Sequence, residues 1–165
     1  MSSKTQITKE QTQKTDSAEA AFAKALRLIS VRERSLSEMR ERLQKEGYPE
    51  EQVDDTIERL VLYGLLDDTR FAEAYIKGKL RSGWGKIRIE RGLKTFGVDV
   101  STIEEYPQAY FSVEDEVERA LKELSRLKTI AKNVRDAQYR RLYSKGYSYD
   151  TIKRALSRYE NDDCY

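Results

Sequence analysis

The chain has 165 residues, of which 36% are charged and 38% are hydrophobic, and its 31 basic and 29 acidic side chains leave a net charge of +2. This composition favours a helical protein with charged outer faces over a protein with one large core, and any nucleic-acid surface must come from local clustering of cations. The sequence has no histidine and one cysteine, Cys164, which excludes histidine-based catalysis, a thiolate cluster and an internal disulfide.

The first residues carry neither a membrane span nor a secretory signal. No apolar run approaches the roughly 20 residues that cross a bilayer, and residues 1–17 lack the apolar stretch of a signal peptide. The lone cysteine is typical of a reducing compartment, so we expect a cytoplasmic protein. Residues 1–17 are rich in Thr, Gln, Ser and Lys, which predicts a disordered polar tail.

Three tandem repeats are predicted after this tail. Gly47, Gly97 and Gly146 stand at intervals of 50 and 49 residues, and a leucine precedes each of them by four positions. A helix with a buried leucine, a glycine at its C-terminal cap and a second helix after it explains these columns. Apolar residues upstream repeat in the same register and indicate a further helix in each repeat. The predicted boundaries are 18–66 for repeat 1, 67–111 for repeat 2, 112–161 for repeat 3 and 162–165 for a C-terminal tail.

Local signals place the helices of repeat 1. Ser35 with Glu38 three positions later is typical of a capping box that opens the second helix. Pro49 stands where proline is tolerated, at the start of the third helix. We expect these helices near residues 18–32, 36–47 and 50–63.

The later repeats carry similar signals and one exception. Ser112 is a predicted N-cap in repeat 3, and Asp67 or Asp68 in repeat 2, so this acidic pair is interpreted as a cap and not as a catalytic site. Pro107 replaces an apolar residue of the repeat and predicts a kinked or split third helix. A three-helix repeat has little core of its own, so the predicted fold is all-α, with the repeats stacked into an elongated curved rod.

Basic residues cluster in repeats 2 and 3. Residues 77–94 contain seven basic residues against one acid, residues 119–145 contain nine against two, and repeat 1 contains eight against ten. Such stretches bind phosphate or an acidic protein surface without recognising a sequence, or they form a solvated helix face.

Three aromatic residues accompany these cations. Tyr139 and Tyr143 fall in columns that are otherwise polar and are four residues apart, so we expect neighbours on an exposed helix face. They would stack on bases or dock on a partner, or else pack against an adjacent repeat or the end of the chain.

Trp84 lies between two glycines and is either an anchor or the closure of its own helical hairpin. Tyr147 belongs to an apolar column and is predicted to be structural. The candidate contact residues are Lys77, Arg81, Trp84, Arg88, Arg91, Lys94, Tyr139, Arg140, Arg141 and Tyr143.

Three segments of the chain carry longer motifs. They are Gly-Leu-Leu-Asp-Asp-Thr-Arg-Phe-Ala at 64–72, the Arg-x-x-Ser-x-x-Glu-Met-x-x-Arg-Leu pattern at 32–43, and Gly-Trp-Gly-x-x-Arg-Ile at 83–89. Together these segments resemble the RecX family, bacterial regulators of the RecA recombinase. The resemblance extends over about residues 20–160 and is looser in repeat 3. Pro107 and the placement of Trp84 between glycines depart from the family pattern.

The resemblance implies a function that composition does not. A RecX protein binds along the groove of the RecA filament on single-stranded DNA, contacts RecA protomers, meets DNA weakly or only within the filament, and lowers recombinase activity in recombination, repair and the SOS response. It implies a monomer that is not an enzyme and needs no cofactor or metal. From the residues alone, a free-standing nucleic-acid-binding repeat and a protein–protein scaffold remain open, whereas the sequence shows no constellation of acid, base and nucleophile for an enzyme.

Overall fold

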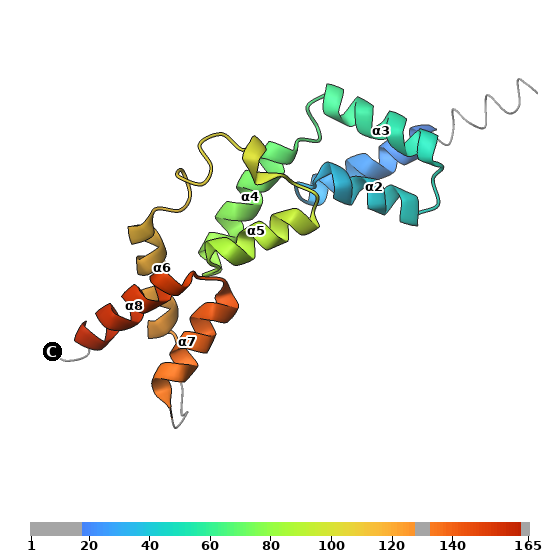
Figure 1. Cartoon of the computed structure of the whole chain (residues 1–165). Coiled ribbons are helices and arrows are strands. Elements are labelled where there is room, and N and C mark those ends of the chain that lie inside the picture. The colour runs from blue at the N-terminus through green and yellow to red at the C-terminus, as the bar shows by residue number, and fades with distance from the viewer. Residues whose placement is uncertain (1–17, 128–132, 163–165) are drawn as a thin grey trace, which may run out of the picture. The chain divides into compact units, whose positions relative to one another are not determined.

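The computed structural model describes residues 18–127 and 133–162, and every regular element in these ranges is helical (Figure 1). It divides into two compact units. The N-terminal unit extends to Phe71 and includes Phe96–Val98, and the C-terminal unit contains Ala72–Thr95 and the chain from Asp99 onward. No helix of the described ranges is long and apolar enough to cross a membrane. The predicted all-α class is confirmed, while the tail residues 1–17 and 163–165 lie outside the described residues.

Repeat 1 lies in the N-terminal unit. Residues 18–31 are helical, and α2 (Leu36–Lys45) and α3 (Glu50–Leu62) follow (Figure 1). The Ser35 hydroxyl accepts a hydrogen bond from the Glu38 N–H at 3.1 Å, which confirms the predicted cap of α2. This helix ends two residues earlier than expected, because Gly47 adopts a φ of +88° and turns the chain toward α3.

Repeat 2 has two full helices and a short third element. They are α4 (Asp68–Arg81), α5 (Lys86–Thr95) and the 3₁₀ helix η1 (Val100–Thr102). Asp67 caps α4, since its carboxylate accepts from the Thr69 N–H at 2.7 Å. Turns occupy residues 104–110, where a full third helix would run. The sequence predicts a third helix kinked or split at Pro107, whereas the regular structure of repeat 2 ends at Thr102, five residues earlier, and no helix runs through Pro107, which has no N–H to continue one.

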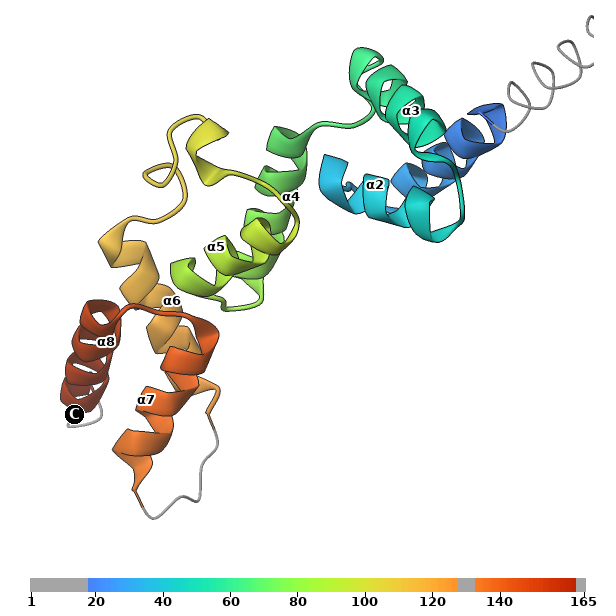
Figure 2. The same ribbon diagram turned by 45° about the vertical axis from the view of Figure 1, so that its right-hand side comes forward.

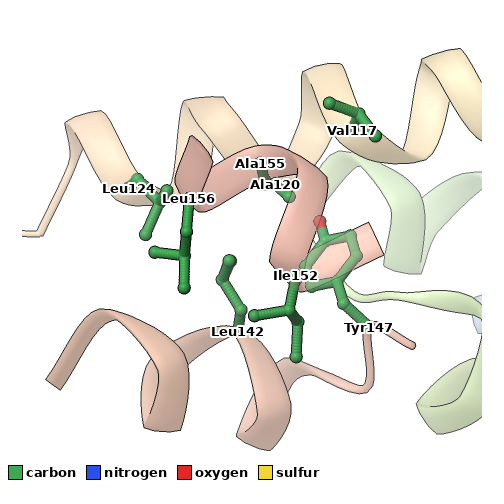
Figure 3. Packing of buried hydrophobic residues seen from close by; sticks show 8 residues of the cluster. All are labelled: Val117, Ala120, Leu124, Leu142, Tyr147, Ile152, Ala155 and Leu156. Atoms are coloured by element: carbon green, nitrogen blue, oxygen red, sulfur yellow. The ribbon is translucent and has the colours of Figure 1, made fainter. Parts of the chain in front are cut away.

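Repeat 3 is a three-helix bundle within the C-terminal unit. It consists of α6 (Val113–Ser125), α7 (Val134–Lys145) and α8 (Tyr149–Asp162), and α6 contacts both other helices (Figure 2). The Ser112 hydroxyl accepts from the Asp115 N–H at 3.1 Å, as predicted for the cap of α6. Apolar side chains from the three helices meet in one core around Leu142 and Ile152 (Figure 3).

The repeat columns of the sequence are columns of buried residues. The leucines four positions before the repeated glycines are fully buried, at 0% exposure; they are Leu43, Leu93 and Leu142. The three glycines all have a left-handed backbone, with φ of +88°, +72° and +87°; they are Gly47, Gly97 and Gly146. The periodic leucines and glycines of the sequence therefore mark one recurring local structure, a buried leucine followed by a left-handed turn.

Candidate interface on the C-terminal unit

Repeats 2 and 3 meet where the turn before α5 lies against the turn after α7. The Gly85 N–H donates to the Lys145 carbonyl at 2.8 Å, and the Ile87 N–H donates to the Gly146 carbonyl at 3.1 Å. A Cβ atom at Gly85 would lie 2.5 Å from the Gly146 carbonyl oxygen, so a larger residue requires the backbone to move. The bonds satisfy carbonyls at the C-terminal end of α7, which a helix leaves without an internal partner. We call this contact the glycine joint; it fixes α5 beside the end of α7.

A buried carboxylate lies beneath the glycine joint. Glu123 of α6 is 3% exposed, and its oxygens pair with Arg141 at 3.1 Å, Lys145 at 3.3 Å and Arg126 at 3.3 Å. A Cβ atom at Gly83 would lie 2.2 Å from the Glu123 Oε1 atom, so the chain passes directly over this carboxylate. A buried charge is tolerated only with such partners. The positive charge of Arg141 is therefore engaged within the protein.

Tyr147 closes the joint from the core side. It is 1% exposed, and its hydroxyl donates to the Gly83 carbonyl at 3.2 Å. Burial raises the pKa of the Tyr147 phenol above its ordinary value, which keeps the group protonated and able to donate. The prediction that Tyr147 is structural is confirmed.

A related contact joins repeats 1 and 2 within the N-terminal unit. The Leu36 N–H at the start of α2 donates to the Asp68 carboxylate at 2.8 Å, and the Ser35 hydroxyl donates to the Phe96 carbonyl at 2.8 Å. In the C-terminal unit, the Lys86 N–H at the start of α5 donates to the Glu116 carboxylate at 3.3 Å. In both units a carboxylate of the following repeat thus satisfies the first N–H of a second helix.

Trp84 is held between two cations. It is half-buried, with the Lys79 ammonium 4.5 Å and the Arg88 guanidinium carbon 3.9 Å from its ring centroid. Arg88 also donates to the Ser144 carbonyl at 3.1 Å. The guanidinium of Arg88 is therefore held by two contacts. One is the cation–π contact with the indole of Trp84, and the other is the hydrogen bond to the Ser144 carbonyl of repeat 3.

A pocket of about 240 Å³ lies between α5 and the end of α7. It contains two arginines of one sequence cluster and a tyrosine of the other, which are 52 positions apart at the closest. None of its lining residues is acidic. We call it the α5–α7 pocket; it is lined by Ile87, Arg88, Arg91, Tyr143, Ser144, Gly146 and Tyr147.

The two candidate tyrosines of α7 form a stacked pair. The ring centroids of Tyr139 and Tyr143 are 6.1 Å apart and their planes differ by 11°. Tyr143 is 67% exposed, as predicted, whereas Tyr139 is partly buried and packs against the core of repeat 3. The prediction of an exposed face is therefore confirmed for Tyr143 and wrong for Tyr139, because the core of repeat 3 covers part of the Tyr139 ring.

The other candidate cations lie outside the pocket lining. Lys77 pairs with Glu73 at 3.1 Å along α4, and Arg140 donates to the Asp136 carbonyl at 3.2 Å along α7. Arg81 and Lys94 are exposed and, like Arg91 of the pocket lining, have no side-chain hydrogen bond or ion pair to any residue of the described ranges.

Sequence reasoning missed three parts of this surface. Glu123 counted only as an acid within a basic stretch, although it anchors Arg141. Ile87 and Ser144 carried no signal, because they line the pocket through the fold and not through a motif. Within the described ranges, no group of three or more Asp, Glu, Cys or His side chains could hold a metal ion.

Two parts of the chain match family models. Residues 21–60 match the first three-helix domain of RecX, and residues 67–106 match the second three-helix domain of RecX. The regulatory protein RecX of Bacillus velezensis is 35% identical over 156 residues, which cover 90% of this chain and 59% of that protein. This chain therefore spans about three-fifths of the length of that relative.

Shorter relatives match over nearly their whole length. The regulatory protein RecX of Prosthecochloris aestuarii is 32% identical over 139 residues, covering 82% of this chain and 91% of that protein. The crystal structure of RecX from Lactobacillus salivarius has the same fold, with a TM-score of 0.74, 22% identity and coverage of 88% of this chain and 98% of that one. From these matches, the chain belongs to the RecX family.

Proposed function

We propose that this chain is a regulator, and not an enzyme, that binds a RecA filament on single-stranded DNA and lowers recombinase activity. Its relatives are named regulatory proteins, and the resemblance to the RecX family supplies the recombinase as partner. The observation that carries the proposal is the surface of the C-terminal unit. There, Arg91 of α5, which has no partner in the described ranges, lines one pocket with the exposed, stacked Tyr143, next to the glycine joint.

Charge supports a polyanionic partner. Arg91 and Lys94 are exposed on α5 and have no acidic partner among the described residues, so their charge is available to a phosphate or a carboxylate. Trp84 and Arg88 are already ordered by their mutual contact, which lowers the entropic cost of presenting them to a partner. We place this activity in the cytoplasm, with the chain as a monomer and without a cofactor.

The test is RecA-catalysed ATP hydrolysis on single-stranded DNA, titrated with the full chain at moderate salt. We expect inhibition well below one molecule per RecA protomer, because simple competition for DNA needs far more protein. No inhibition, or inhibition that excess DNA abolishes, would indicate the free-standing nucleic-acid-binding repeat.

A charge-reversal pair locates the surface. We expect Arg91→Glu with Lys94→Glu to abolish inhibition while the helical circular-dichroism spectrum is unchanged, because neither side chain supports the fold. Arg27→Glu with Arg42→Glu is the matched control, since both residues are exposed arginines of repeat 1 and the net charge changes equally. Equal loss of inhibition in both pairs would contradict the assignment to α5.

A further inference from the structure

We propose that the α5–α7 pocket receives one nucleotide of single-stranded DNA, with the phosphate on Arg88 and Arg91 and the base stacked on the free face of Tyr143. The inference rests on the proposed function, because it assigns the nucleic-acid component of the filament to one site. Three features of the pocket carry it: uncompensated charge, an aromatic face and size.

The charge in the pocket is positive and not neutralised. Arg88 is oriented by the Ser144 carbonyl and the Trp84 ring, neither of which is an anion. Arg91 is exposed, has no partner among the described residues and lies three positions along α5, hence on the same helix face. A guanidinium presents a planar set of donors that matches phosphate oxygens. Two of them on one wall form a phosphate site.

The aromatic wall is supported from one side and otherwise largely exposed. Tyr143 stacks on Tyr139, which packs on the core of repeat 3, so the outer ring has a partner on that side. At 67% exposure Tyr143 leaves much of its surface to solvent, where a base can add a further layer. Ile87, 37% exposed, adds an apolar contact at the edge of the pocket. Stacking of this kind accepts any base.

Size and chemistry together favour a nucleotide. The volume of about 240 Å³ is below the range of about 300–1,000 Å³ that holds drug-sized ligands. It suits a phosphate and one base that lie partly in the open. A carboxylate of an acidic protein would also pair with the arginines, but it would form no stacking contact with the exposed Tyr143 ring beside them.

Binding of labelled oligothymidylate to the full chain, followed by fluorescence anisotropy at several salt concentrations, tests the proposal. We expect Arg91→Gln to weaken binding and to reduce the slope of log affinity against log salt by about 0.7, the value for one single-strand phosphate. We expect Tyr143→Leu to weaken binding about tenfold and Tyr143→Phe to retain affinity, because stacking requires the ring and not the hydroxyl.

Two controls separate a site from general charge. Arg27→Gln removes the same charge from an exposed position of repeat 1 and is expected to leave the salt slope unchanged. The double variant Arg91→Gln with Tyr143→Leu is expected to lose less than the product of the two single losses, since both residues contact one nucleotide. Equal effects of Arg27→Gln and Arg91→Gln would overturn the proposal.

Photocrosslinking supplies a direct readout. An oligonucleotide with 5-iododeoxyuridine is expected to form its main adduct at Tyr143, and a main adduct outside the pocket would contradict the proposal. If the double variant binds oligothymidylate as the wild type does, the pocket is not a nucleotide site. The proposed function is then tested separately, by measuring whether the wild-type chain inhibits RecA. Conversely, loss of oligonucleotide affinity in a chain that never inhibits RecA supports the pocket and removes the proposed function.

Discussion

The guanidinium of Arg88 lies over the indole of Trp84, 3.9 Å from the ring centroid, while its NH1 atom donates to the Ser144 carbonyl at 3.1 Å. One side chain of repeat 2 thus contacts the turn of its own hairpin and the last turn of α7 in repeat 3. The residue that we assign to phosphate binding is therefore ordered by the same contacts that join the repeats.

Because Trp84 is the sole tryptophan, its fluorescence reports this contact. We predict that Arg88→Gln changes the emission maximum and intensity of the native protein, since the ring loses a cation worth about 0.5–1 kcal/mol at an exposed site. Arg91→Gln is the control, because no contact of Arg91 with the ring is present. Identical spectra for Arg88→Gln and the wild type would show that the stacking is absent in solution.

Two glycine substitutions, one in the glycine joint and one outside it, are expected to change the free energy of unfolding in opposite directions. Gly85→Ala places a Cβ 2.5 Å from the Gly146 oxygen, so we expect the free energy of unfolding to fall by about 1–3 kcal/mol, the usual cost of overpacking. Gly78→Ala, within α4, meets no atom within 4 Å and is expected to raise it by up to about 1 kcal/mol through helix propensity. Urea unfolding measures both, and a stabilising Gly85→Ala would show that the turns do not touch.

Removal of the charge of Glu123 should destabilise the C-terminal unit. In Glu123→Gln the side chain keeps its shape, but Lys145 and Arg141 lose their carboxylate, and we expect a loss of about 1–3 kcal/mol in the free energy of unfolding. Glu41→Gln, which removes an exposed ion pair with Lys45, is expected to change it by less than about 1 kcal/mol. Comparable losses in the two variants would contradict a supporting role for Glu123.

Because Tyr147 and Tyr106 have phenols with raised pKa values, we expect the protein to lose stability at alkaline pH. Burial raises the pKa of both phenols, and the bond with Glu90 raises that of Tyr106 further. Both phenols are neutral in the folded and unfolded chain below about pH 10; above it the unfolded chain ionises first, so stability decreases as the pH rises. Tyr147→Phe should cost about 1 kcal/mol at neutral pH through the lost hydrogen bond to Gly83.

Urea unfolding at pH 8 and pH 11 checks this sign. The difference between the two pH values should be smaller in Tyr147→Phe than in the wild type, because one buried phenol is gone. A difference that is unchanged by the substitution would show that Tyr147 ionises equally in both states.

Local patterns were sufficient to predict most of the helices. The Ser35 and Ser112 caps depend on neighbours within a few residues, so the sequence contains the whole signal for them, whereas Pro107 did not reveal that the third element of repeat 2 ends at Thr102. The glycine joint could not be predicted in this way. It consists of backbone bonds between residues about 60 positions apart, such as Gly85 and Lys145, and no side-chain pattern encodes them.

The sequence identified several residues of the candidate site but not how they are arranged in space. Charge counting found Arg88 and Arg91, and the polar column found Tyr143, but only the fold brings them to one pocket. The same counting treated Arg141 as a contact residue, although Glu123 already engages its charge. Charge density along a sequence does not distinguish a cation that has an internal partner from one that is available to a ligand.

A joint made of main-chain atoms has a consequence for how such a protein diverges. Because the bonds between Gly85, Ile87 and the end of α7 do not use side chains, these bonds do not depend on which outward residues the repeats carry. A change in the length of either turn, in contrast, would shift every donor away from its acceptor. Relatives with very different surface residues can therefore keep one arrangement of helices.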